Sequence, residues 1–332
     1  MFMTPSQIVS SLHTLLSIRQ PVFLWGAPGV GKSQVVAAVA KSMGYALRDI
    51  RAVLLDPVDL RGIPRITAEG ATEWCAPSFL PSASDPEKGI LFLDELNSAP
   101  PLVQAACYQL ILDRRIGEYV LPDGWVVVAA GNREKDRAVT HRMPTALSNR
   151  MVHLEFDVSL DDWLAWAVRS GIRPEVTAFL QFRPRLLHDF DPQSASRAFA
   201  SPRSWAFVSS ILAASPAADV EYGLYRGTVG DAAAAEFMGF LGVWRELPSV
   251  SEILAAPLTA RVPTEPAALY AICEALASQA SHQTMPAVVE YLNRLPVEFG
   301  VLCIKQAVCR DTAVVESPAF SEWAQAHADV LV

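Results

Sequence analysis

The chain has 332 residues, of which 51% are hydrophobic and 19% are charged, and its formal net charge is -8 at pH 7. This length allows two domains, since a single core seldom grows past roughly 250 residues, and the acidic balance argues against nucleic acid as the main partner. Five scattered cysteines without a C-x-x-C pair, no secretory leader and no long apolar run predict free thiols in a cytoplasmic protein without a membrane segment.

The first third of the chain alternates helical and strand patterns. Thr4 is expected to cap a helix whose apolar residues recur at helical spacing up to Leu16. A short buried strand over 22–25 is followed by a helix over 32–43, which Gly44 ends. The next segment, 46–55, is strand-like.

A region punctuated by proline and glycine, 56–88, leads into a wholly apolar strand over 90–93, as expected in a parallel sheet covered on both faces. Another helix is predicted to run from about Ser98 through Leu112. The segments 116–121 and 125–130 flank Pro122-Asp123-Gly124 and are expected to pair as a hairpin. Strands separated by helices predict an α/β fold with a doubly wound parallel sheet.

The pattern changes at about residue 155. Strand signals fade there, and alanine-rich helical patterns follow, for example over 160–167, 205–214 and 231–247. We therefore place an α/β domain at 1–155 and expect helices in the rest of the chain.

A glycine-rich turn, GAPGVGKS at 26–33, stands between the first predicted strand and its helix and fits G-x-x-x-x-G-K-[ST]. Its glycines allow backbone N–H groups to surround a β-phosphate, and the helix N-terminus adds partial positive charge. Lys32 is expected to reach the β- and γ-phosphates, and the Ser33 hydroxyl to bind Mg²⁺. The residues expected to contact nucleotide are Gly26, Ala27, Pro28, Gly29, Val30, Gly31, Lys32, Ser33 and Gln34.

Two carboxylates, Asp94 and Glu95, end the apolar strand over 90–93 and should lie at the carboxyl edge of the sheet. Asp94 is expected to hold Mg²⁺ together with Ser33. Glu95 is expected to orient the attacking water, because phosphoryl transfer needs positioning and charge stabilisation. Asn132 follows the next apolar strand, where it serves either this site or an Asx turn. The motifs together predict nucleoside-triphosphate hydrolysis.

Five motifs, GAPGVGKS, ILFLDE, AAGNR, ALSNRM and SPRSW, follow one another in an order and spacing that resembles the AAA+ ATPases. Over roughly residues 4–215 the chain is most similar to the MoxR branch and its phage and bacterial relatives. The resemblance implies a P-loop NTPase domain at 1–155, an all-α lid domain at 156–260 and a helical C-terminal extension at 261–332. It also implies a homo-oligomeric ring, usually a hexamer, with each active site completed by a neighbour.

The resemblance assigns three further residues to catalysis. Asn132 matches the sensor-one asparagine, Arg150 the arginine finger that acts in trans, and Arg203 the sensor-two arginine of the lid. A guanidinium suits the charge that develops on a transferring phosphoryl group. Arg142 is the alternative finger, and a local ion pair is the alternative role for Arg150.

The expected function is Mg²⁺-dependent ATP hydrolysis in a ring, coupled to remodelling or assembly of a partner protein. ATP is preferred to GTP because the chain has no Asn-Lys-x-Asp signature. In the family, insertions matching 59–81 and the turn at 122–124 handle the client, and a von Willebrand A domain protein is a frequent partner. Packing is the alternative role for Trp74 and Trp125. The alternative functions are an ATP-gated scaffold with little turnover and a nucleic-acid motor.

Overall fold

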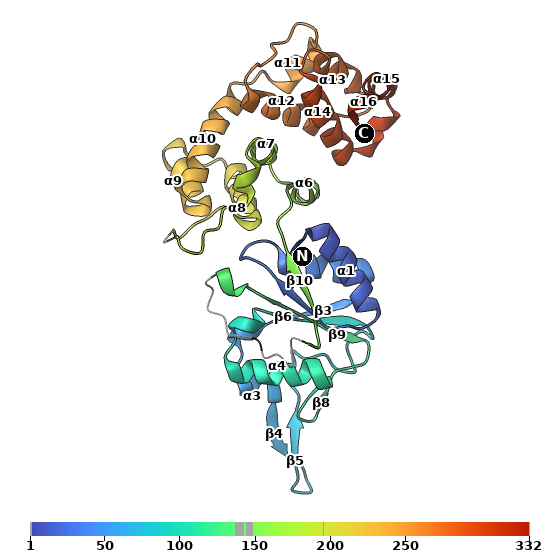
Figure 1. The fold of residues 1–332 in the computed structure, drawn as a ribbon, viewed down its shortest axis with the longest axis vertical. Coiled ribbons are helices and arrows are strands. Elements are labelled where there is room, and N and C mark those ends of the chain that lie inside the picture. Colours follow the sequence, from blue (N-terminus) through green and yellow to red (C-terminus); the bar gives the residue numbers. More distant parts are fainter. Residues whose placement is uncertain (1, 137–142, 144–148, 195, 332) are drawn as a thin grey trace. The chain divides into compact units, whose positions relative to one another are not determined.

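The fold comes from a computed structural model of the chain, which describes residues 2–136, 143, 149–194 and 196–331. The chain forms two compact units, Met1–Ser159 with Asp191–Ser194, and Leu160–Phe190 with Ala195–Val332 (Figure 1). No helix in the described ranges is both long and apolar enough to cross a membrane.

A six-stranded parallel sheet forms the centre of the first unit. Its strands, in spatial order, are β1 (Phe2–Met3), β10 (Val152–Phe156), β2 (Val22–Trp25), β9 (Trp125–Gly131), β6 (Gly89–Asp94) and β3 (Ala46–Arg51). The predicted α/β class with a parallel sheet is confirmed. Strands β1 and β10 were not predicted from the sequence.

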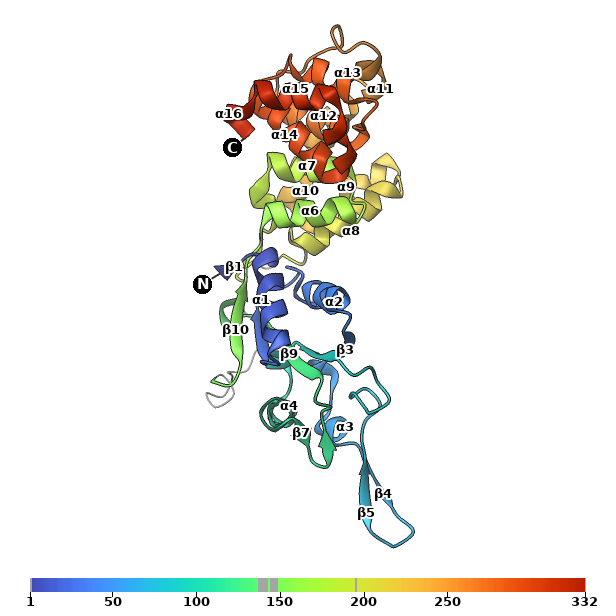
Figure 2. The same cartoon turned by 90° about the vertical axis from the view of Figure 1, so that its right-hand side faces the viewer.

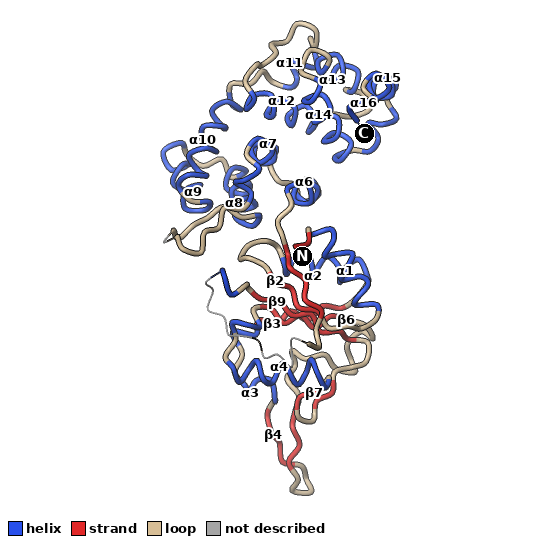
Figure 3. Tube along the Cα trace, viewed as in Figure 1, coloured by secondary structure: helices blue, strands red, loops and turns tan. Residues whose placement is uncertain are grey.

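Helices cover both faces of this sheet. They are α1 (Pro5–Ser17), α2 (Lys32–Met43), α3 (Pro57–Arg61) and α4 (Pro101–Asp113). Apolar residues of α4 pack against one set of alternate strand residues, including Phe23, Leu91 and Val127. Figure 3 shows α1 and α2 on the other side of the red strands. This burial on two sides explains why the buried parts of β2, β6 and β9 are uninterrupted runs of apolar residues.

Local capping explains where the first helices begin and end. The predicted Thr4 cap is present: Gln7 N donates to Thr4 Oγ1 over 3.4 Å, and Thr4 N donates to Gln7 Oε1 over 3.0 Å. Gly44 ends α2 in the left-handed conformation, with φ of +67°, as predicted.

Two predictions about strands need correction. The strand predicted over 46–55 ends at Arg51, where a short 3₁₀ helix, Ala52–Leu54, begins. The predicted hairpin across 122–124 is wrong, because β9 pairs in parallel with β2 and β6 on its two sides. The hairpin lies just before it, between β7 (Arg115–Ile116) and β8 (Tyr119–Val120).

The region that the sequence analysis assigned to an insertion contains α3 and a second hairpin. Its strands are β4 (Ile63–Ile66) and β5 (Thr72–Cys75), which pair antiparallel. Every residue of both strands is exposed. Figures 1 and 2 both show this hairpin projecting away from α3 and α4.

The second unit is helical, as predicted for the chain beyond the first domain. Its helices are α6 (Leu160–Arg169), α7 (Pro174–Phe182), α8 (Pro202–Ala213), α9 (Ala218–Val229), α10 (Asp231–Arg245), α11 (Val250–Ala255), α12 (Pro266–Gln279), α13 (Met285–Leu292), α14 (Val297–Arg310), α15 (Pro318–Ala326) and α16 (Ala328–Leu331). The division of this unit into a lid and an extension stays a prediction.

A buried carboxylate joins three of these helices. Glu274 of α12 is 1% exposed and accepts hydrogen bonds from Thr177 Oγ1 of α7 over 2.6 Å and from Gln181 Nε2 over 3.3 Å. It also forms an ion pair with Arg310 of α14. Because a buried charge is tolerated only when it is paired and hydrogen-bonded, these contacts fix the packing of α7, α12 and α14.

Candidate active site at the carboxyl edge of the sheet

Three neighbouring strands end together at one edge of the sheet. Trp25 at the end of β2 is in register with Gly131 at the end of β9, and β6 ends beside them at Asp94. The loop after β2, the two carboxylates after β6 and Asn132 after β9 therefore meet at this edge. Parallel pairing alone produces this convergence.

The glycine-rich loop has the backbone that the motif requires. Gly29 and Gly31 have φ of +78° and +101°, a region that residues with a Cβ rarely adopt. Gly31 is also the N-cap of α2, which has no side-chain cap and no acidic residue in its first turn. The N-terminal amides of α2 are therefore suited to an anion from outside the helix.

Gly26 makes room for the loop against the sheet. A Cβ added at this position would lie 3.0 Å from Phe156 Cβ of β10. The Gly26 amide donates to Gly131 O over 3.2 Å, which ties the start of the loop to the end of β9. A larger residue here would push the loop away from the sheet edge.

The Lys32 ammonium is held by three oxygens. Its Nζ donates to Gly26 O over 2.7 Å, to Ala27 O over 3.0 Å and to Asn132 Oδ1 over 3.2 Å. A positive charge at the start of a helix is unfavourable in the helix dipole, so it needs compensating oxygens. The same ammonium lies where it can neutralise an anion bound in the loop.

Ser33 and Asp94 form a pair of hard oxygen ligands. The Ser33 hydroxyl donates to Asp94 Oδ2 over 2.8 Å, although the residues are 61 positions apart. Throughout the described residues no group of three His, Cys, Asp or Glu side chains could hold a metal. This donor set fits Mg²⁺, which takes one or two protein oxygens and fills its shell with waters and substrate phosphates.

Glu95 turns the chain away from the strand. Its φ is +56°, in the left-handed region that is uncommon for residues other than glycine, and its amide donates to Asp94 Oδ1 over 3.0 Å. The side chain is exposed at the sheet edge. This backbone conformation is a local strain of the kind that clusters at functional sites.

Asn97, which the sequence analysis missed, supports the residues after β9. It is 2% exposed, and its Nδ2 donates to Asn132 O over 2.7 Å. Gln104 Nε2 in turn donates to Asn97 O over 3.3 Å, and Tyr108 OH donates to Gln104 Oε1. The signal in the sequence was a polar residue two positions after Glu95, followed by a glutamine on the next helix.

Gly131 is the reason that Asn97 fits. A Cβ at Gly131 would lie only 2.1 Å from Asn97 Oδ1, so any other residue would displace the amide.

A second residue that the sequence analysis missed is Asp49 of β3, next to β6. Burial and the nearby Asp94 carboxylate raise the pKa of Asp49, while Arg51 opposes the shift.

The predicted arginines lie away from this cluster of contacts. Arg150 is exposed in the first unit, and its carbonyl accepts a hydrogen bond from Gln20 Nε2 over 3.4 Å. Arg203 is exposed in the first turn of α8, in the helical unit. Neither makes an ion pair with a carboxylate of the described residues. Arg142 and residues 146–148 of the ALSNRM motif lie outside the described residues.

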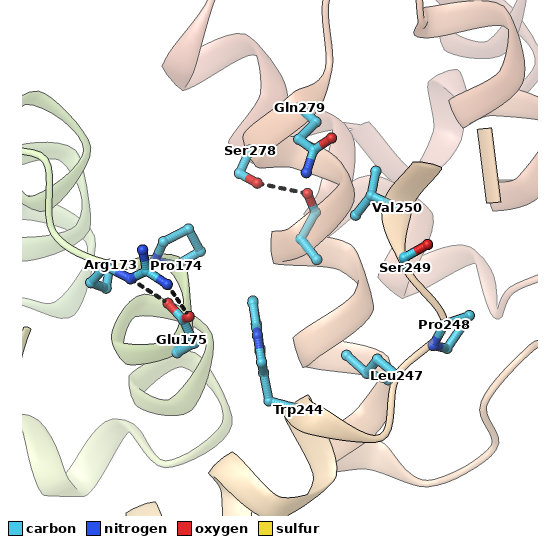
Figure 4. Close-up of a pocket in the computed structure, with 11 residues that line it drawn as sticks. Arg173, Pro174, Glu175, Trp244, Leu247, Pro248, Ser249, Val250, Ser278 and Gln279 are labelled. Atoms are coloured by element: carbon cyan, nitrogen blue, oxygen red, sulfur yellow. Dashed lines mark hydrogen bonds and ion pairs between the residues drawn. The ribbon is translucent and has the colours of Figure 1, made fainter. Parts of the chain in front are cut away.

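The helical unit has a pocket of its own, of about 320 Å³. Figure 4 shows Arg173 and Glu175, an ion pair at the start of α7, with Ser278 and Gln279 of α12 and Trp244 of α10. None of the predicted site residues lines it. It is therefore distinct from the site around the glycine-rich loop 26–33, which we call the phosphate loop.

Two solved structures with similar folds are distant from this chain in sequence. NtrX from Brucella abortus, solved in complex with ATP, is 15% identical, with a TM-score of 0.44, and the match covers 98% of this chain and 66% of that one. The RuvB Holliday junction branch migration motor of Thermotoga maritima is 15% identical, with a TM-score of 0.37, over 97% of this chain and 86% of that one. At these TM-scores the likeness over whole chains is weak.

Sequence comparison gives a more specific result. Midasin from Giardia intestinalis is 31% identical over 161 residues, which are 45% of this chain and only 3% of midasin. Residues 21–151 match the family described as "AAA domain (dynein-related subfamily)". The matched range includes the phosphate loop, Asp94, Glu95 and Asn132, which the sheet brings to one edge. The chain therefore carries an AAA domain over residues 21–151.

Proposed function

We propose that this chain binds ATP and Mg²⁺ at the phosphate loop and hydrolyses ATP. The observation that carries the proposal is the meeting of Lys32, Ser33, Asp94 and Asn132 through hydrogen bonds at one edge of the sheet of an AAA domain. These residue types match what phosphoryl transfer requires, namely a cation for the phosphates, oxygens for a metal and a polar group for the water or γ-phosphate.

Each residue has a distinct role in this proposal. Residues 26–34 contact the triphosphate through backbone amides and through Lys32, and Ser33 and Asp94 hold Mg²⁺, which neutralises developing phosphate charge. Glu95 orients and polarises the attacking water. Asn132, already in contact with the Lys32 ammonium, positions the water or the γ-phosphate.

The finer proposal is a homo-oligomeric ring of the MoxR type, with six subunits, that remodels or assembles a partner protein. Arg150 would complete the site of a neighbouring subunit, and its exposure without a described carboxylate partner supports this role. Arg203 would respond to bound γ-phosphate from a lid at 156–260, with a helical extension at 261–332. The partner is a client protein, for which a von Willebrand A domain protein is one candidate.

The test of the ATPase is the substitution Glu95→Gln. We expect steady-state turnover to fall at least about a hundredfold, as for other residues whose contribution is realised in the transition state. The affinity for ATP, measured by calorimetry, should remain, since Glu95 does not hold the phosphates. Equal turnover of the variant and wild type would contradict the proposed mechanism and favour the ATP-gated scaffold.

The test of the ring is the substitution Arg150→Ala, examined by mass photometry with and without ATP. Normal assembly and normal ATP affinity with lost turnover would support a role in the neighbour's site. Retained turnover would move that role to another residue, with Arg142 first to be tested. Strong stimulation of turnover by single- or double-stranded DNA at moderate salt would favour the nucleic-acid motor instead.

A further inference from the structure

A groove of about 840 Å³ lies beside the projecting β4–β5 hairpin, entirely within the first unit. One side is formed by β5 and the loop that follows it, and the other by the β7–β8 hairpin and the residues after it. Its apolar and aromatic lining includes Trp74, Pro77, Leu80, Tyr119, Val120 and Pro122. The phosphate loop does not contribute to it.

The edge of β5 that faces this groove carries backbone groups without a strand partner. In an antiparallel pair, alternate residues direct their N–H and C=O groups away from the partner strand. Trp74 is such a residue, because its amide donates across the groove to Glu118 Oε2 over 3.2 Å and not to β4. Thr72, two residues earlier in the same strand, has the same orientation by this alternation.

The opposite edge of the hairpin is protected in part, at Pro64. Pro64 of β4 lies directly opposite Trp74, at a position whose N–H would point outward, and proline has no N–H to offer. Proline on an exposed edge is a common device against unwanted strand pairing. The hairpin therefore has one blunted edge on β4 and one open edge on β5, and the open edge faces the groove.

The surface around the open edge is apolar and acidic. Ile66 and Val120 are 81% and 64% exposed, and the Trp74 side chain is 40% exposed. Two of the three carboxylates that line the groove are paired, Glu73 with Arg65 and Asp85 with Arg48. Glu118 has no cationic partner among the described residues and accepts only the Trp74 amide, so a basic residue of a partner could pair with it.

We propose that the outer edge of β5 binds an extended segment of a partner polypeptide as an added strand. The segment would take the place of Glu118 at the Trp74 amide and pair with the outward groups of Thr72 and Trp74. It would place apolar side chains against Trp74 and Val120 and direct a lysine or arginine to the displaced Glu118 carboxylate. Strand addition to an open edge derives affinity from main-chain hydrogen bonds and specificity from alternate side chains. This strand addition would be the way in which the chain binds the partner protein that it is proposed to remodel, and it rests on that proposed function.

The test uses the full chain without nucleotide and fluorescence anisotropy of a labelled eight-residue peptide that alternates valine and lysine. We expect saturable binding, and at least a tenfold loss of affinity when every peptide nitrogen is methylated, because methylation removes the donors and leaves the side chains. Equal affinity of the methylated peptide, or no binding of the parent peptide, would overturn the proposal.

Two matched proline variants test the edge itself. Thr72→Pro removes an outward N–H from β5, and Ile66→Pro removes one from β4, opposite to it in register. We expect at least a tenfold loss of affinity for Thr72→Pro and wild-type affinity for Ile66→Pro. Equal peptide affinities of the two variants would contradict the assignment of β5 as the binding edge. If a proline variant loses its hairpin, the comparison of the parent peptide with the methylated peptide on the wild-type chain still tests the proposal.

Charge is tested with Glu118→Gln, which keeps an oxygen for the Trp74 amide. This variant should bind the valine–lysine peptide several times more weakly but a valine–serine peptide unchanged. A dimer that forms without peptide and is lost in Thr72→Pro would identify a second copy as the occupant and overturn the proposal. Because no ATP is present, failure here leaves the proposed ATPase untouched, and loss of ATPase activity does not alter peptide binding.

Discussion

At the scale of single residues, the candidate site depends on groups that hold other groups in place. Asn132 is held from two sides. Its side-chain Oδ1 accepts a hydrogen bond from the Lys32 ammonium, and its backbone carbonyl accepts one from the side-chain amide of the buried Asn97. Asn97 is itself held by Gln104 from α4. A small displacement of Asn132 would therefore move one of the polar groups around the phosphate loop.

We expect Asn97→Ala to lower kcat by about tenfold to a hundredfold, because misplacement of a positioning group by about 1 Å has effects of this size. The dissociation constant for ATP should change little, since the described hydrogen bonds of Asn97 are with Asn132 and Gln104 and not with the loop. The loss of a buried hydrogen bond should also lower the free energy of unfolding by about 1–3 kcal/mol. Turnover, calorimetry and urea unfolding measure the three quantities.

A matched variant separates positioning from stability. Gly131→Ala places a Cβ within 2.1 Å of Asn97 Oδ1 and should produce the same loss of kcat while Asn97 is still present. Unchanged kcat in both variants, despite lower stability, would show that Asn97 is only structural.

The sequence predicted the residues with fixed spacing best. The sequence could place the loop 26–33, Asp94 and Asn132 at one edge of the sheet, because each comes at the end of an apolar strand. Their roles in binding and catalysis stay predictions. Asn97 and Asp49 were not found, because their surroundings exist only once α4 and β3 have packed beside β6.

At the scale of elements, the strands with uninterrupted apolar residues were predicted, whereas β1 and β10, which lack such a run, were not. β6 and β9 are buried along almost their whole length, whereas β10 has a mixed burial pattern and β1 has two residues. The hairpin prediction at 122–124 failed because a turn signal does not reveal how the following strand pairs. Trp125 instead begins a central strand of the parallel sheet.

The Glu274 network makes a prediction about how helices α7, α12 and α14 are held together. Glu274→Ala leaves Arg310, whose side chain is 19% exposed, without its partner. Removal of one member of a buried ion pair typically lowers the free energy of unfolding by about 3–5 kcal/mol. Chemical denaturation followed by circular dichroism should show a loss of this size.

The double variant Glu274→Leu with Arg310→Met is the control. It removes both charges, and Thr177 Oγ1 keeps the carbonyl of Pro174 as an acceptor at 3.0 Å. We expect most of the lost stability to return, because apolar replacement of a buried pair is often neutral. A double variant as unstable as the single one would show that the network stabilises the packing in some other way.

At the scale of the whole molecule, thiol reactivity reports burial in both units. Cys75 and Cys309 are exposed, and Cys107, Cys273 and Cys303 are buried. Burial raises the pKa of Cys107 to about 12, so almost none of this thiol is ionised at pH 8. The pKa of Cys303 is also raised, by its hydrogen bond with Cys273 and by burial.

We therefore expect two of the five thiols to react rapidly with Ellman's reagent at pH 8 in the native protein, and all five in denaturant. The buried thiols should react slowly because the thiolate is the nucleophile, and a raised pKa lowers the thiolate fraction at a given pH. Rapid reaction of more than two native thiols would contradict the described packing.

The central claim, that the AAA domain captures a triphosphate through its phosphate loop, is tested most directly by calorimetry with Lys32→Ala. The account predicts no measurable ATP binding in the presence of Mg²⁺, because the ammonium that faces Gly26 O, Ala27 O and Asn132 Oδ1 is gone. Lys41→Ala, an exposed lysine in the last turn of the same helix, is the matched control and should bind ATP as the wild type does. Undiminished ATP binding by Lys32→Ala would contradict the account.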